Sequence, residues 1–243
     1  MNPAPIFVLT HGLDIGSPLA AGLAARGARV AWLSDGSEAP ACDLDPAVLR
    51  FDAGFASRAE VERAVSAAQQ RLGTPAQVVI SAIPRAGLRA REITSLSDDD
   101  WRAACGAAMK SVLYALQAAY TAMAGPGGSV VVVGPSLSLA GAGQLVALST
   151  AIEGQRGLVK STARQWGQRG ITVNWIAAAP RGLSPVFDGL PLPMKLDAVM
   201  VALGRPLDLA GEIAPVIEFL GSAAGKVITG ATLVLDGGEW MVP

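Results

Sequence analysis

The sequence predicts an α/β fold: a single Rossmann-like domain with a doubly wound parallel sheet of about seven strands and helices on both faces. Three observations lead to this prediction. Short runs rich in valine and isoleucine recur without alternating polar residues, as in strands that are buried on both faces. Amphipathic segments with helix-start signals separate these runs. The chain has 243 residues, of which 51% are hydrophobic and 16% charged, enough for one sizeable core.

The strands are expected at seven apolar runs: 6–10, 29–33, 48–52, 77–81, 129–133, 171–176 and 231–235. Helices are expected at 17–26, 58–72, 98–123, 146–168 and 207–221. Ser57 with Glu60, and Ser97 with Asp100, have the spacing of a capping box at the starts of two of these helices. Because strand–helix–strand units with right-handed crossovers build a doubly wound sheet, residues 1–243 are expected to form one domain.

Composition and charge narrow the class of protein. The net charge of −1 and the lack of a basic block predict no nucleic-acid partner. No apolar stretch reaches the roughly 18 residues that a membrane span needs, and no basic segment precedes the first apolar run. The two cysteines, Cys42 and Cys105, predict neither a disulfide framework nor a metal cluster. We therefore expect a cytoplasmic protein with no membrane partner and no metal.

Several motifs make the fold prediction more specific. Residues 171–176 (ITVNWI) and 204–238, with GRP, ITG and LDGG in order, resemble the sixth strand and carboxyl-terminal signature of the short-chain dehydrogenase/reductase family. Trp101 and the LSDDD before it are also similar to that family, and the resemblance extends from residue 6 to residue 240. It implies an NAD(P)-dependent oxidoreductase. In this family a tyrosine transfers the proton, a lysine four residues later tunes it, and a serine and an asparagine assist.

The resemblance fails at these catalytic positions. Counting from Val173 and Asn174, the tyrosine position is Leu148, the lysine position is Ile152 and the asparagine position is Ala108. The serine position is Pro135 or, with a gap of one residue, Ser136. Hydride transfer to a carbonyl develops negative charge on oxygen, which must be protonated or stabilised by hydrogen-bond donors. The side chains of leucine and isoleucine offer neither a proton nor a hydrogen-bond donor. The sequence therefore predicts no catalytic residues and a chain that is not an enzyme on its own.

The cofactor loop also departs from the family pattern TGxxxGxG. Residues 10–16 read THGLDIG, one residue short, so that Thr10, Gly12 and Gly16, together with Asp52 after the third strand, are vestiges of a cofactor site. Asp14 either repels a phosphate or caps the following helix. The acidic ribose-binding position falls on Ser34, with Asp35 one place later. The prediction is that this chain takes no cofactor and that NAD(P) binds to a partner subunit.

The catalytic side chains of the family are missing, whereas the segments that form its subunit interfaces are retained, and this combination favours one functional hypothesis. The expected helices 98–123 and 146–168 and the tail 238–243 correspond to segments that form interfaces in the family. Small residues on the two helices would allow close approach of a partner: Ala107, Ala108, Ala118, Ala119, Gly154, Gly157 and Ala163. We expect a catalytically inactive subunit that supports an active paralogous NAD(P)-dependent hydroxyacyl or alcohol dehydrogenase in a hetero-oligomer of tetrameric size. A small-molecule sensor and an oxidoreductase with altered catalytic residues are the alternatives.

Overall fold

A computed structural model describes residues 4–37, 40–192 and 201–241. Seven parallel strands form one sheet in the order β3-β2-β1-β4-β5-β6-β7. Their bounds are β1 Ile6–Gly12, β2 Val30–Ser34, β3 Val48–Asp52, β4 Gln77–Ile83, β5 Gly128–Pro135, β6 Ile171–Ala178 and β7 Thr232–Leu235. All seven predicted strands are confirmed, and with them the doubly wound fold.

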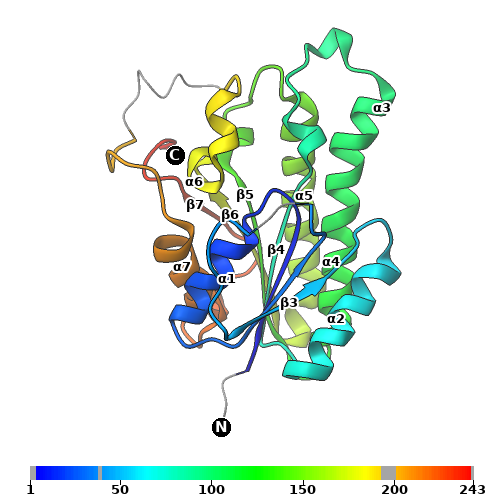
Figure 1. The fold of residues 1–243 in the computed structure, drawn as a ribbon, viewed down its shortest axis with the longest axis vertical. Helices are drawn as coiled ribbons and strands as arrows, with labels where there is room; N and C mark the ends of the chain where they lie inside the picture. Colours follow the sequence, from blue (N-terminus) through cyan, green and yellow to red (C-terminus); the bar gives the residue numbers. More distant parts are fainter. Residues whose placement is uncertain (1–3, 38–39, 193–200, 242–243) are drawn as a thin grey trace.

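Helices cover both faces of the sheet (Figure 1). On one side lie α1 (Gly16–Ala25), α6 (Pro180–Leu183) and α7 (Ala214–Gly221), and on the other α2 (Arg58–Leu72), α4 (Ala107–Met123) and α5 (Val146–Trp166). The five inner strands are buried between the two layers, which explains why their sequences do not alternate with polar residues, whereas the edge strands β3 and β7 are partly exposed. Within the described residues, no helix has the length and apolar character needed to cross a bilayer.

The predicted helix 98–123 is divided. It begins as α3 (Asp98–Trp101), continues as a π-helical segment η3 (Arg102–Gly106) and becomes α4. The capping box at Ser97 is confirmed in both directions. Ser57 accepts the backbone N–H of Glu60, but the Glu60 carboxylate returns to the N–H of Ala56 instead of Ser57. The wider π turn places small buried residues of this segment against α5.

The small residues expected at a subunit interface are mostly internal. Ala108, Ala118, Ala119 and Ala163 are at most 5% exposed, because they pack within the core of the chain itself. Gly157 is exposed with open space around its Cα. The argument from small residues to a partner therefore does not hold for the four alanines.

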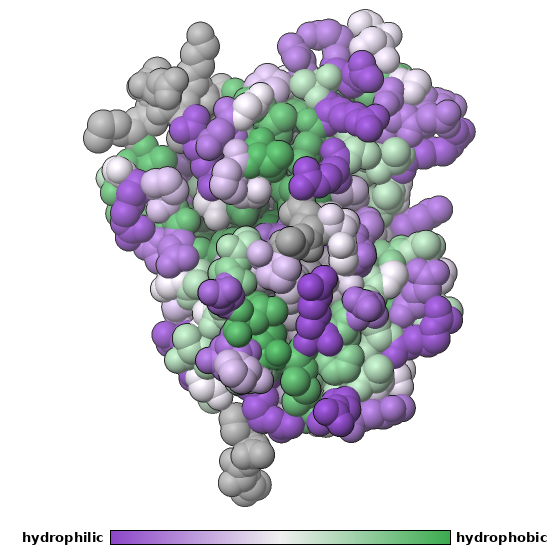
Figure 2. Space-filling view, viewed as in Figure 1, coloured by the Kyte–Doolittle hydropathy of each residue, from purple (hydrophilic) through white to green (hydrophobic). Residues whose placement is uncertain are grey.

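The face shown in Figure 2 has small hydrophobic patches among hydrophilic residues. The hydrophilic residues gather near the end that carries α3. No continuous apolar surface covers this face. Scattered apolar residues of this kind are normal on a folded protein.

Candidate functional site

The strand order reverses between β1 and β4. β2 and β3 lie on one side of β1, whereas β4 to β7 lie on the other. The chain therefore leaves β1 and β4 in opposite directions, and the carboxyl ends of the two strands border a crevice. Gly12 at the end of β1 pairs in register with Ile83 at the end of β4. Ligands of open α/β sheets bind at this kind of position, so we place the candidate site there.

The glycine-containing turn after β1 is shaped by close packing. Gly12 has φ +89°, and a side chain at this position would collide with the carbonyl group of Ile83. Gly16, the first residue of α1, lies against the indole of Trp32 and the side chain of Thr10. The Oγ1 of Thr10 accepts a 2.9 Å hydrogen bond from Nε1 of Trp32. The three residues predicted as vestiges of a cofactor loop are therefore required by the packing of the turn.

Asp35 directly follows β2 and closes one side of the crevice. Its Oδ2 accepts the backbone N–H of Gly12 at 3.2 Å and lies 2.6 Å from Nδ1 of His11. Its Oδ1 accepts the hydroxyl of Ser37 at 2.6 Å and the backbone N–H of that residue at 3.0 Å. Burial alone would raise the pKa of Asp35, but the hydrogen bonds from His11 and Ser37 outweigh burial and hold the pKa well below its ordinary value. Asp35 is thus an anion at the edge of the site.

Asp14 lies at the amino end of α1. Its carboxylate accepts the backbone N–H of Ser17 at 2.8 Å and that of Ala41 at 2.7 Å, and also contacts the Ser17 hydroxyl. The capping role that the sequence allowed for Asp14 is confirmed. The carboxylate nevertheless remains at the helix terminus, where backbone N–H groups attract anions. Asp52, at the end of β3, is exposed and lies in register with Ser34.

The positions that correspond to catalytic residues are apolar and buried. Leu148 and Ile152 lie one turn apart on α5, and each is 1% exposed. Ala108 on α4 is fully buried. Ser136, in the short helix η4 (Ser136–Leu139) after β5, is 1% exposed, and its Oγ has no hydrogen-bond partner among the described residues. Only Ser136 offers a polar group at these four positions.

One residue near these positions was not predicted. Gln155, on the buried face of α5, donates from Nε2 to the carbonyl oxygens of Ala82 at 3.1 Å and Ala108 at 3.2 Å. It thereby connects the end of β4, the start of α4 and α5. A polar residue three places after Ile152, on the apolar side of the helix, was the available signal.

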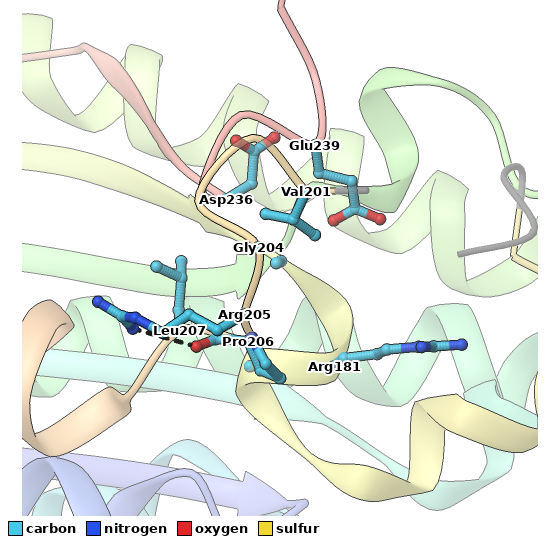
Figure 3. A pocket seen from close by; sticks show the side chains of 10 residues that line it. Arg181, Val201, Gly204, Arg205, Pro206, Leu207, Asp236 and Glu239 are labelled. Carbon is cyan, nitrogen blue, oxygen red and sulfur yellow. Dashed lines mark hydrogen bonds between the residues drawn. The ribbon is translucent and has the colours of Figure 1, made fainter. Parts of the chain in front are cut away.

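A cavity of about 190 Å³ opens beside the ends of β6 and β7 (Figure 3). Ten residues line it: Ala179, Arg181, Gly182, Val201, Gly204, Arg205, Pro206, Leu207, Asp236 and Glu239. They come from α6, from the segment before α7 and from the turn after β7. The glycine turn and α5 contribute none of them, so the cavity is separate from the crevice between β1 and β4. In residues 4–37, 40–192 and 201–241, the cavity included, no cluster of three or more metal-ligating side chains occurs.

Comparisons with known proteins assign the chain to a family. The enoyl-(acyl carrier protein) reductase family matches residues 12–239. Trans-4-hydroxycyclohexanecarboxylate dehydrogenase of Sinomonas cyclohexanicum is 32% identical over 72% of this chain and 64% of its own length. The (3R)-3-hydroxyacyl-CoA dehydrogenase of mouse is 26% identical over 99% of this chain and 98% of its own. A Brucella melitensis 3-ketoacyl-(acyl-carrier-protein) reductase, solved with NADH, has TM-score 0.82 at 20% identity, covering 98% and 99% of the two chains.

These findings contradict two expectations from the sequence. The expectation of a chain that is not an enzyme on its own is wrong, because the family and the relatives are named as dehydrogenases and reductases. The expectation that this chain takes no cofactor is also wrong, because a protein of the same architecture was solved with NADH. Both expectations rested on the identity of single side chains at the family's positions.

The residues of the crevice fit a dinucleotide in part. Ser34 and Ser81 lie in register with Thr10 on either side, and their buried hydroxyls have no partner among the described residues. Together with the carboxylate of Asp35, they offer polar groups to an adenosine and its ribose. The fit is poorer at the amino end of α1, where the carboxylate of Asp14 would face the pyrophosphate.

Proposed function

Because this chain belongs to the short-chain dehydrogenase/reductase family, we propose that it is a subunit of a nicotinamide-dependent oxidoreductase. Its substrates would be acyl thioesters with a hydroxyl or carbonyl group on the acyl chain, or alcohols and the carbonyl compounds formed from them. The observation that carries the proposal is the match to a hydroxyacyl-CoA dehydrogenase over 99% of the chain. The crevice where the sheet reverses its order supports the proposal.

The residues for the adenosine end of the dinucleotide are Asp35, Ser34 and Asp52. Asp35 would accept hydrogen bonds from the ribose hydroxyls, and Asp52 lies exposed at the neighbouring strand end. The dinucleotide, when bound, supplies or accepts the hydride. The role of the chain is to bind and orient it, while the apolar Leu148 and Ile152 exclude water from the interior beside the crevice.

The proton that accompanies hydride transfer is not supplied from the family's tyrosine position in this chain. Leu148 and Ile152 carry no exchangeable side-chain proton, and general acid–base catalysis is worth about 10²–10⁴ in rate. We infer that this chain assembles with a paralogue that has tyrosine and lysine at these positions, in a hetero-oligomer of tetrameric size. The exposed Leu113 of α4 and the open surface at Gly157 of α5 are consistent with a contact there. A cytoplasmic location remains a prediction from the sequence.

Co-purification tests this proposal. The protein, tagged and isolated gently from its own host, is expected in a native mass spectrum with a second chain of similar mass that carries an intact YxxxK motif. NADH oxidation by this complex with a 3-oxoacyl-CoA should exceed that of either chain alone. A spectrum showing only this chain, together with full turnover by this chain alone, would refute the hetero-oligomer.

A second candidate is proton transfer assisted by this chain itself through Ser136. The buried, unpartnered Oγ of Ser136 favours it. Turnover by the isolated chain that survives Leu148→Ala and is lost in Ser136→Ala would support this candidate. Ser161→Ala, at an exposed position of α5, is the matched control and should not affect turnover.

A further inference from the structure

The cavity beside β6 and β7 has walls from three segments that are distant in the sequence. Pro206 and Leu207 give it an apolar lining on one side, and Val201 lies on the other beside Asp236 and Glu239 of the turn after β7 (Figure 3). About 10–15 Å³ of such space is sufficient for one water molecule. The 190 Å³ therefore accommodate a ligand of several non-hydrogen atoms.

Three of the four charged residues in this cavity are committed to contacts within the chain. Nε of Arg181 lies 3.1 Å from Oδ1 of Asp188. Arg205 holds both carboxylate oxygens of Glu212, at 2.7 and 2.9 Å. Both arginines thus have a carboxylate partner outside the cavity lining, although Nε of Arg181 is near Asp188 without the geometry of a hydrogen bond.

Asp236, the third of these residues, is 3% exposed. Its two oxygens accept the backbone N–H groups of Gly238 at 2.9 Å and Trp240 at 2.8 Å. These hydrogen bonds stabilise the turn that carries Glu239. Asp236 therefore has a structural role and is not available to bind a ligand.

Glu239 is the exception. Its Oε2 is buried and has no hydrogen-bond donor among the described residues, and its side chain extends from the turn into the region bordered by Val201 and Arg181 (Figure 3). Burial and the charge of Asp236 raise the pKa of Glu239, while Arg181 lowers it. A buried acceptor without a donor is unfavourable, so a donor that enters the cavity would be bound favourably.

We propose that this cavity is a second ligand site, which binds a short alkylammonium compound through its N–H groups to Glu239. The apolar walls contact the alkyl chain, and Glu239 accepts from the head group. An ammonium group is favoured over a hydroxyl because hydrogen bonds between two charged groups are about twice as strong as neutral ones. The site goes beyond the proposed oxidoreductase function and is independent of it.

Ligand-observed NMR at pH 8 with n-butylammonium as the probe tests the site. A ligand of five non-hydrogen atoms is expected to bind with a Kd of roughly 1 mM. Glu239→Gln, which preserves the shape of the side chain, should weaken n-butylammonium at least about tenfold while changing 1-butanol little. Val201→Phe should fill the cavity and abolish both, whereas Val227→Phe, at a position that is 88% exposed, is the matched control.

Competition separates this site from the dinucleotide crevice. Saturating NADH should leave the binding of n-butylammonium unchanged, and the probe should not alter NADH affinity. The proposal is overturned by absence of binding at 50 mM probe (about fifty times the expected Kd). Equal binding of butyrate, insensitivity to Glu239→Gln, or displacement by NADH would each overturn it too. If Val201→Phe fails to fold by circular dichroism, the isosteric Glu239→Gln variant alone decides the outcome.

Discussion

His11 and Asp35 meet across the turn that follows β1, with Nδ1 of the imidazole 2.6 Å from Oδ2 of the carboxylate. The ring of His11 also packs against Phe55, with ring centroids 5.2 Å apart. A histidine takes the place of the first glycine of the family loop and is thereby paired with the carboxylate that we propose binds a ribose.

Asp35→Asn is expected to destabilise the protein by roughly 1–3 kcal/mol at pH 7, because it removes a hydrogen-bonded charge. A depressed pKa in the folded state contributes stability that is complete above the ordinary value of 3.8 and is lost as the pH falls toward the folded-state pKa. The difference from the parent should therefore shrink below about pH 3.8. Urea unfolding at pH 7 and pH 3 measures it. Asp43→Asn, at an exposed position, should have little effect at either pH.

Asp14→Asn is expected to strengthen NADH binding. The substitution removes a negative charge from the amino end of α1, where a pyrophosphate would approach. Two charges about 4 Å apart interact by ~1 kcal/mol in water and by ~4 kcal/mol at an effective dielectric constant of 20, so a gain of at least about fivefold is expected. Titration of NADH fluorescence measures the affinity, with Asp99→Asn on α3 as control. Unchanged or weaker binding would show that the carboxylate is not opposed to the cofactor.

Gln155→Ala is expected to cost roughly 1–3 kcal/mol of unfolding free energy. It leaves the carbonyl oxygens of Ala82 and Ala108 without their buried donor. Chemical denaturation of the variant and of Gln165→Ala, an exposed glutamine on the same helix, measures the difference. Equal stability of the two variants would mean that water replaces the lost amide.

Glu239→Gln is expected to be more stable than the parent at pH 8 and to lose this advantage near pH 4. A carboxyl group whose pKa is raised by folding binds its proton more tightly in the folded than in the unfolded state. Stability therefore falls as the pH rises from the ordinary value of 4.5 through the folded-state pKa. Urea midpoints across pH 4–8 provide the measurement, with the exposed Glu92→Gln as control. A parent more stable than the variant at pH 8 would indicate that Glu239 has a donor in solution.

The sequence predicted the fold well because each strand has a local apolar signal. The strand ends were less predictable. β1 continues to Gly12 and β5 to Pro135, where pairing with Ile83 and Ala178 on neighbouring strands extends the ladder. Such pairing depends on residues far away in the chain, so no local pattern reports it.

The sequence identified which residues occupy the family's catalytic positions, but it did not predict the hydrogen bonds around the site. The sequence located Leu148, Ile152, Ala108 and Ser136, and the structure confirms that the first three are buried and apolar. The bonds from Gly12 to Asp35 and from Ala41 to Asp14 join residues 23 and 27 positions apart. They arise only when β1 and β2 pair side by side. The separate cavity at Glu239 likewise needs three segments to converge.

The packing of Trp32 provides an optical probe of the crevice. Its indole is 1% exposed, lies against Gly16 and donates to Thr10, with the guanidinium of Arg50 5.0 Å from the ring centroid. Tryptophan emits in the range where a reduced nicotinamide ring absorbs, so energy transfer between the two is possible. This indole lies close to the first turn of α1, beside the crevice. Excitation of tryptophan should therefore produce nicotinamide emission when NADH binds, and Trp32→Phe should remove the part of that signal that originates beside the glycine turn.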